Sequence, residues 1–210
     1  NTYTGVTTIS AGTLSVSSLA NGVSNSNIGA SSNAAANLVL DGGTLKYTGA
    51  AVSTDRLFTM TNNGGTIDAS GSGALTFTNA GSIAYTGTNA RTLTLTGSGS
   101  ATLSQVLANN TGATSLTKTG TGTWTLSGTN TYTGITTISG GILSISSDAN
   151  LGYVPSSVTA SSISLGGGAL QVTANMILNA NRGITMTANS GLAATSTNTL
   201  VYAGTITGGF

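Results

Sequence analysis

The chain has 210 residues, of which only 4% are charged, and its formal net charge is +1. It contains no cysteine and no histidine, which excludes a disulfide framework, a thiolate nucleophile, an imidazole base and the common zinc sites. The five basic residues are scattered, so no basic cluster is present to neutralise nucleic-acid phosphates or an anionic membrane. Hydrophobic residues still reach 38% and recur at ordered intervals, which indicates a folded chain rather than a low-complexity tract.

Short strands of alternating polarity are predicted along the whole chain. Each has one apolar row and one row of Thr or Ser, with Gly or Asn at its ends. Strands of this kind indicate an all-β fold, and the alternation alone leaves sandwich, barrel and solenoid open. Residues 30–40 (ASSNAAANLVL) form the one stretch with a predicted turn of helix. The predicted strands are, in chain order, residues 12–17, 37–41, 43–49, 74–79, 82–87, 91–97, 122–128, 141–146, 162–167 and 198–204.

An internal repeat decides between these architectures. The opening phrase NTYTGVTTISAGTLSVSS returns from Asn130 as NTYTGITTISGGILSISS, with four substitutions in eighteen positions. The similarity continues further, because residues 38–70 align with residues 163–195. A long repeat that tolerates insertions at its turns is typical of a solenoid, in which each coil contacts only its neighbours.

We therefore predict one β-helix segment over residues 1–210, with no substantial helix. Residues 1–70 resemble residues 130–195, and residues 71–129 form spacer coils. At about 20 residues per coil, the segment would contain roughly ten coils. Because the chain begins within the repeated phrase, we expect it to be a slice of a longer array.

The repeated phrase contains no acid, base or thiol, so we interpret it as a corner followed by a strand. Ile9 and Ile138 are predicted to point inward, and most Thr side chains outward. Gly and Asn supply the positive φ angles that tight turns need. Most aromatic residues fall in apolar rows and are predicted to pack in the core, with Tyr3 and Tyr132 left open. The residues assigned to the structural repeat and its turns are Asn1, Tyr3, Gly5, Gly12, Arg56, Gly122, Trp124, Gly128, Asn130, Tyr132, Gly134, Gly141 and Arg182.

The basic residues have a functional and a structural interpretation. Arg56 and Arg182 occupy equivalent positions in the two copies of the repeat. They would be either a periodic contact for an anionic glycan or structural arginines that bind turn carbonyls, and we favour the second. Lys46, Arg91 and Lys118 are predicted to be solvated turn or edge residues.

Four aspartates are the candidate catalytic or calcium-binding groups: Asp41, Asp55, Asp68 and Asp148. Clustered carboxylates serve β-helix enzymes that act on polysaccharides, so a carbohydrate-active enzyme is the first alternative. The second copy lacks the first three acids, and Asp41 and Asp55 stand at turns, where Asp commonly caps its own backbone. Residues 64–70 (GGTIDAS) do not match the tandem calcium-binding nonapeptide. We therefore predict no catalytic residue, no metal and no cofactor.

Threonine rows raise a second alternative, an ice-binding solenoid. Such a face needs Thr-x-Thr at the same place in every coil. The tripeptides begin at residues 59, 76, 92 and 123, which are irregularly spaced. We therefore interpret the Thr rows as the outward face of an uncharged solenoid, for which Thr is a good strand former.

Residues 115–146 (SLTKTGTGTWTLSGTNTYTGITTISGGILSIS) resemble the autotransporter-associated β-strand repeat. The resemblance runs through Leu-Thr-Lys-Thr-Gly at 116–120, Gly-Thr-Trp-Thr-Leu-Ser-Gly at 122–128 and Asn-Thr-Tyr-Thr-Gly at 130–134. It implies a right-handed parallel β-helix exported to the outside of a Gram-negative-like bacterium. Repeats of this family are spacers and scaffolds in adhesins and biofilm proteins, and they offer no catalytic residues to transfer.

The function predicted from these features is that of a non-catalytic structural segment of a secreted bacterial adhesin or extracellular filament. The segment would be a stiff rod at the cell surface. Its expected partners are adjacent repeats or further copies stacked end to end, together with glycans or proteins of host or neighbouring cells. Nucleic acid and membrane insertion are not expected.

Overall fold

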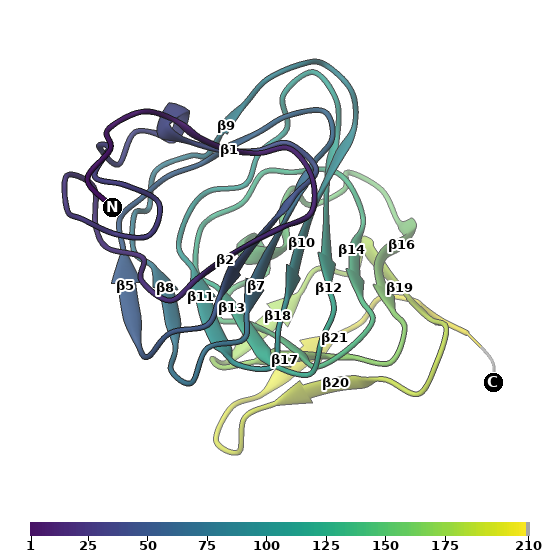
Figure 1. Ribbon diagram of the computed structural model, residues 1–210. Coiled ribbons are helices and arrows are strands. Elements are labelled where there is room, and N and C mark those ends of the chain that lie inside the picture. Colours follow the sequence, from purple (N-terminus) through teal and green to yellow (C-terminus); the bar gives the residue numbers. More distant parts are fainter. Residues whose placement is uncertain (209–210) are drawn as a thin grey trace.

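The computed structural model describes residues 1–208, in which all ladders between named strands are parallel (Figure 1). Gly209 and Phe210, the end of the predicted segment, lie outside the described residues. A four-stranded sheet contains β1 (Thr7–Ile9), β3 (Leu38–Leu40), β6 (Thr59–Met60) and β9 (Ala84–Tyr85). A nine-stranded sheet contains β2 (Thr13–Val16), β4 (Thr44–Tyr47), β7 (Gly65–Ala69), β10 (Arg91–Thr96), β12 (Thr114–Lys118), β14 (Thr136–Ile138), β16 (Thr159–Leu165), β19 (Arg182–Met186) and β22 (Ile206–Thr207).

The remaining strands complete the other faces. A seven-stranded sheet contains β5 (Val52–Thr54), β8 (Leu75–Phe77), β11 (Ser100–Leu103), β13 (Thr123–Leu126), β15 (Ile142–Ile145), β17 (Ala169–Val172) and β20 (Gly191–Ala194). A two-stranded sheet pairs β18 (Met176–Leu178) with β21 (Leu200–Tyr202). Two short 3-10 turns, η1 (Ala35–Asn37) and η2 (Asp148–Leu151), are the helical elements of residues 1–208.

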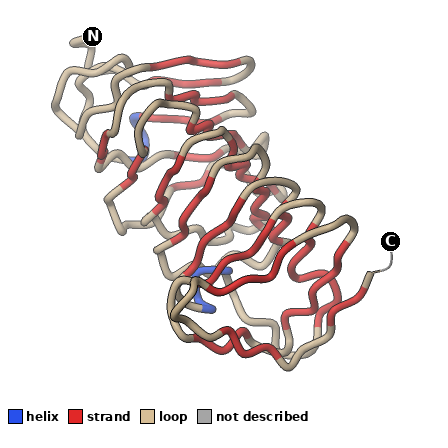
Figure 2. The backbone as a smooth tube through the Cα atoms, turned by 90° about the horizontal axis from the view of Figure 1, so that it is seen from below, coloured by secondary structure: helices blue, strands red, loops and turns tan. Residues whose placement is uncertain are grey.

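The chain winds as a parallel β-solenoid, which confirms the predicted fold class. It visits the four-, nine- and seven-stranded sheets in turn and returns to each one layer further along, as in the runs β3-β4-β5 and β6-β7-β8. Figure 2 shows the strands stacked in rows, with the two termini at opposite ends of the stack. In the chain order, β18 and β21 take the place of the four-stranded sheet.

The predicted count of roughly ten coils is too high, because the coils are longer than about 20 residues. Thr13 pairs with Thr44, 31 residues away, whereas Thr117 pairs with Thr137, only 20 residues away. Other coils fall between these limits, and the long sheets contain nine and seven strands. Long coils carry irregular loops where another coil has a strand, as residues 17–34 do between β2 and β3.

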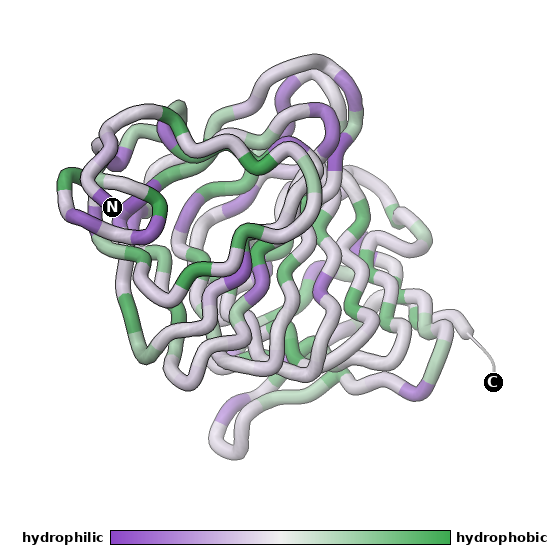
Figure 3. The backbone as a smooth tube through the Cα atoms, in the orientation of Figure 1, coloured by the Kyte–Doolittle hydropathy of each residue, from purple (hydrophilic) through white to green (hydrophobic). Residues whose placement is uncertain are grey.

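A continuous core follows from the parallel register. In the seven-stranded sheet, Trp124 pairs with Ala101 in one neighbouring coil and with Leu143 in the other, and all three are buried. The indole nitrogen of Trp124 donates to the carbonyl of Thr96 at 2.8 Å, so its polar atom is satisfied as well. Burying one Leu-sized side chain contributes about 1.5–3 kcal/mol, and the stacked rows repeat this gain in every coil. Figure 3 shows hydrophobic residues recurring along successive strands.

The ten predicted strands all coincide with strands in the structure, although β16 begins three residues earlier than its predicted segment. The predicted turn of helix within residues 30–40 is the 3-10 turn η1. As predicted, Ile9 and Ile138 are buried, with 5% and 0% exposure.

The two copies of the repeat occupy different faces of the solenoid. Strand β1 lies in the four-stranded sheet, but its sequence equivalent β14 lies in the nine-stranded sheet. Likewise, β2 lies in the nine-stranded sheet and its equivalent β15 in the seven-stranded sheet. The same displacement relates β3 to β16 and β4 to β17. The sequence repeat is therefore a whole number of coils plus one face.

Candidate functional site

The repeated phrase folds as a corner that closes the loop of its own coil. The side-chain Nδ2 of Asn130 donates to the carbonyl of Asn150 at 2.6 Å, and Nδ2 of Asn1 donates to the carbonyl of Asn27 at 2.8 Å. Both bonds join the start of the phrase to the loop that follows it by more than twenty residues. The copies therefore share the same corner, although they stand on different faces.

The loop residues at this corner bracket the chain in turn. Asn27 Oδ1 accepts from the backbone N–H groups of residues 17 and 18, at 2.9 and 2.8 Å. Asn150 Oδ1 accepts from those of residues 146 and 147, at 3.1 and 2.9 Å. An Asn side chain bonded to its local backbone stabilises a turn where a sheet ladder is missing.

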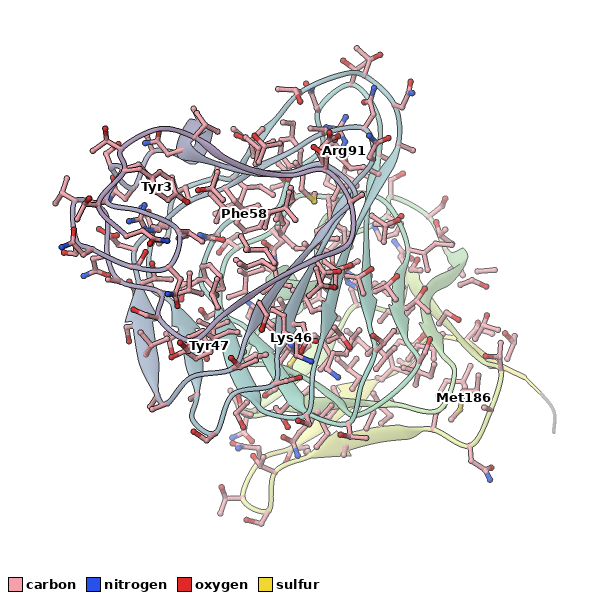
Figure 4. The ribbon with its side chains drawn as sticks, in the orientation of Figure 1. Tyr3, Lys46, Tyr47, Phe58, Arg91 and Met186 are labelled. Atoms are coloured by element: carbon pink, nitrogen blue, oxygen red, sulfur yellow. The ribbon has the colours of Figure 1, made fainter. Side chains whose placement is uncertain are left out.

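Tyr3 and Tyr132, which the sequence left open, have one bonding pattern and different exposure. The hydroxyl of Tyr132 bonds Thr136 Oγ1 at 2.8 Å, and that of Tyr3 bonds Thr7 Oγ1 at 2.7 Å. Tyr132 is 1% exposed and burial raises its pKa to about 12, whereas Tyr3 is 42% exposed. The coil formed by β12 and β13 packs next to Tyr132, and Tyr3 stands on the first coil, near the amino terminus (Figure 4).

Arg56 clamps the loop of the first copy from inside. Its side chain is 2% exposed. It donates from Nε to the carbonyl of Ala20 at 3.0 Å, from Nη1 to that of Ser31 at 2.9 Å and from Nη2 to that of Gly29 at 3.1 Å. Burial lowers the pKa of Arg56, and the carbonyl dipoles satisfy its donors.

Arg182 clamps the second loop in the same way, with one acid added. It donates to the carbonyls of Leu151 at 3.0 Å, Gly152 at 2.8 Å and Tyr153 at 3.2 Å, and its Nε donates to Asp148 Oδ1 at 2.9 Å. With a further bond from Nη2 to the Asp148 carbonyl at 3.1 Å, each of its five N–H groups has an acceptor. These contacts are those of a structural arginine, and no donor is left for an anionic glycan.

The prediction that Arg91 is solvated is wrong. The side chain is only 4% exposed, and it donates to the carbonyls of Thr86 at 3.1 Å, Gly87 at 3.1 Å and Asn89 at 2.8 Å. Its guanidinium also lies 5.2 Å from the ring centre of Tyr85. Arg91 therefore holds a third loop, at a corner distant from Tyr3 (Figure 4).

Lys118 also contradicts the sequence prediction, because it lies in the core with 0% exposure. Its Nζ donates to the carbonyls of Thr119, Gly120 and Gly140 at 2.5, 3.1 and 3.0 Å. Burial lowers the pKa of Lys118 to about 8. The ammonium group thus joins the corners of two adjacent coils.

Lys46 behaves differently from the other cations. Its side chain is 39% exposed, and its Nζ lies 3.8 Å from Asp68 on the neighbouring strand. An exposed pair of this kind contributes little to stability. It does show that the solenoid stacks opposite charges, rather than like charges, in adjacent coils.

The aspartates hold loops rather than each other. Asp41 Oδ1 accepts from Thr61 Oγ1 at 2.5 Å, and Asp55 Oδ1 accepts from the N–H of Gly22 at 2.7 Å. Both bonds cross to another coil, so the prediction that these two acids cap their own backbone is wrong. Within residues 1–208, no three acidic groups gather as a metal site would require.

The predicted turn glycines meet two kinds of constraint. Gly12 and Gly141 have φ angles of +66° and +59°, which favour glycine. Gly122, Gly128 and Gly134 have no printed positive φ, but a Cβ on any of them would lie within 2.4 Å of atoms of the preceding coil. The same atom on Gly5 would meet nothing within 4 Å.

The Thr-x-Thr tripeptides are divided among the faces. Those beginning at residues 59, 76 and 92 lie on β6, β8 and β10, in three different sheets. The nine-stranded sheet nevertheless carries one unbroken outward column of hydroxyls. Its members pair in register from strand to strand and are Thr13, Thr44, Thr66, Thr94, Thr117, Thr137, Ser164, Thr185 and Thr207. Irregular sequence spacing hid this column because the coils differ in length.

The site is therefore a set of loop clamps on a parallel β-solenoid, in which buried cations bind carbonyl groups. No helix within residues 1–208 has the length and apolar character needed to span a membrane. This class of architecture agrees with the comparisons with known proteins.

A family model described as passenger-associated-transport-repeat matches residues 1–16 and 116–145. The chain is also 42% identical over 221 residues to the adhesin BmaC autotransporter of Brucella suis biovar 1 (strain 1330). That alignment covers 99% of this chain but 6% of the relative, so the chain spans a small part of its length. No solved structure gives a significant match. The chain carries autotransporter passenger repeats, as the resemblance of residues 115–146 implied.

Proposed function

We propose that the chain is a non-catalytic structural segment of a secreted bacterial adhesin and that it is displayed at the cell surface. The observation that carries the proposal is the 42% identity to an autotransporter adhesin across 99% of the chain. The carboxylates that an enzyme would need are engaged in separate loop contacts, such as Asp148 with Arg182 and Asp55 with Gly22.

The structure supports a mechanical role in which the segment is a stiff spacer. One sheet of nine strands runs from β2 to β22 without a break, so neighbouring coils are joined by backbone hydrogen bonds along the described chain. Buried rows of side chains couple the same coils from inside. In a solenoid, stability accumulates from such nearest-neighbour contacts.

We propose that adjacent repeats stack on the ends of this segment. Leu192, Ala194, Leu200 and Tyr202 are only partly buried and line a hollow of about 360 Å³ beyond the last coils. A further coil would cover these apolar groups and pair the exposed strand edge, which is otherwise prone to association. Glycans or proteins of other cells are the proposed partners of the outer surface.

The test uses antibodies raised against the purified chain. They should stain intact bacteria that express the parent protein and should reduce bacterial attachment to host cells or surfaces. Staining only after permeabilisation would contradict surface display. Release of reducing sugars when the purified chain is incubated with a polysaccharide panel would contradict the non-catalytic assignment.

The hydroxyl column favours a second candidate, an ice-binding face. No protein hydrogen bond within residues 1–208 uses the hydroxyls of Thr44, Thr66, Thr94, Thr117 or Thr137, so they face solvent unpaired. An ice-recrystallisation assay at micromolar protein tests it. Inhibition that disappears in Thr117→Lys would support this candidate, and normal crystal growth with the unmodified chain would remove it.

A further inference from the structure

A depression of about 280 Å³ lies beside the clamped corner of the second copy. It is bounded by the repeated phrase on one side and by the start of β16 on the other. Its lining residues are Thr133, Gly134, Ile135, Leu151, Tyr153, Pro155, Thr159, Ala160, Ser161, Ser162 and Arg182.

The backbone departs from regular geometry at this depression. Ser161 has a φ of +61°, a conformation that L-residues with side chains rarely adopt and that costs about 1–3 kcal/mol. The pairing of β16 with β19 shifts its register between Thr159 and Ile163. Strain and a broken register at one place indicate a feature that the surrounding structure maintains.

The first copy of the repeat provides an internal comparison. There, the ladder from β1 to β3 is regular, and the loop ends in the 3-10 turn η1. Gly29 of the first copy and Gly152 of the second have the same positive φ and approach the carbonyls of Tyr3 and Tyr132 in the same way.

The residue that follows this glycine differs, however. It is alanine in the first copy and Tyr153 in the second, and each donates its backbone N–H to the tyrosine carbonyl of its corner. The depression is thus built by residues that the scaffold itself does not require. Function is commonly added to a repeated scaffold at such departures.

The chemistry of the lining selects an uncharged ligand. Tyr153 is 58% exposed and offers an aromatic wall. Thr133 Oγ1 accepts from Asn109 Nδ2 at 2.8 Å, which leaves its own proton free to donate. All five N–H groups of Arg182 are occupied by the loop, so the one charged residue of the lining cannot bind an anion.

We propose that this depression binds one ring of a neutral saccharide, with Tyr153 stacking on the sugar and the hydroxyls of Thr133, Thr159 and Ser162 bonding its hydroxyls. The volume is just below the range of about 300–1,000 Å³ that is usual for small-ligand sites, which suits a single ring rather than an oligosaccharide. Rings of Tyr and Trp present a flat apolar face beside a polar edge, which matches the alternating faces of a sugar. The assignment rests on the proposed adhesin function, whose outer-surface partner it specifies.

The test is binding of the full chain to an array of neutral glycans, followed by saturation-transfer NMR with the methyl glycosides of the terminal sugars that bind. Tyr153→Ala should weaken binding at least tenfold. Ala160→Phe, at an exposed position of the lining, should occlude the depression with a similar loss. Ile177→Ala removes an equally exposed apolar side chain that does not line the depression, and it should bind as the unmodified chain does.

Three results would overturn the proposal: no neutral glycan bound by the unmodified chain, a preference for acidic glycans, or equal binding by all variants. Circular dichroism of Tyr153→Ala and Ala160→Phe verifies that each variant is folded. Surface staining of intact cells is read separately, so a failed glycan test with positive staining would reject this site and leave the adhesin function in place.

Discussion

At the scale of single residues, Lys118 couples the core to pH. It lies in the inward row of the nine-stranded sheet, between Leu95 and Ile138, and burial lowers its pKa to about 8. An unfolded lysine titrates near about 10.4, so between pH 8 and 10 the unfolded chain binds more protons than the folded chain. The free energy of unfolding therefore rises with pH in this window, by about 2 kcal/mol from this residue.

The measurement is urea unfolding at pH 8, 9 and 10 for the unmodified chain and for Lys118→Met. The difference between their slopes against pH isolates the lysine, because tyrosines such as Tyr132 titrate equally in both proteins. Thr117→Val, with its outward side chain on the same strand, serves as the control and should keep the slope of the unmodified chain. Parallel slopes for the unmodified chain and Lys118→Met would contradict the prediction.

At the scale of elements, the same glycine in the two copies has different neighbours. A Cβ on Gly134 would lie 2.4 Å from the carbonyl oxygen of Thr114, whereas a Cβ on Gly5 would meet no atom within 4 Å. We expect Gly134→Ala to destabilise the fold by about 1–3 kcal/mol, the usual cost of overpacking. Gly5→Ala should change stability by less than about 0.5 kcal/mol.

Thermal and urea unfolding of the two variants test this contrast. Because both substitutions add the same methyl group to the same sequence motif, their difference measures the contact between coils. Equal losses of stability would mean that the motif's own conformation, rather than the preceding coil, requires glycine.

The two glycines also show what the sequence can and cannot predict. Alternation within a strand is a local signal, which is why ten strands, the inward positions of Ile9 and Ile138 and the solenoid class were predictable. Partners in the next coil are 20 to 31 residues away, and variable loops hide the register. Alternation in residues 114–118 does place Lys118 inward beside Leu116, but its charge led to the opposite prediction. The corner residues were found as a repeat, and the depression beside Tyr153 was not, because it arises where the repeat is broken.

At the scale of the whole molecule, the repeat behaves as a screw. Each strand of the second copy stands one face further around the solenoid than its equivalent in the first, as β14 does relative to β1. With three faces to a coil, a passenger that continued with this spacing would present the clamped corner on each face in turn and return to the first face with the fourth copy. A rod of this kind offers its repeated surface in every direction, which suits attachment to partners on all sides.

This rotation predicts two distances in the chain. Thr13 and Thr137 belong to one column and are separated by five strand steps, or about 24 Å at 4.7–4.9 Å per strand. Thr8 is the sequence equivalent of Thr137 but lies on another face, so this pair must be further apart. Because the chain has no cysteine, Thr13→Cys/Thr137→Cys and Thr8→Cys/Thr137→Cys can be spin-labelled selectively and measured by pulsed electron paramagnetic resonance. If the copies instead stood on one face, the order of the two distances would be reversed, since Thr8 would then share the column of Thr137 and Thr13 would not.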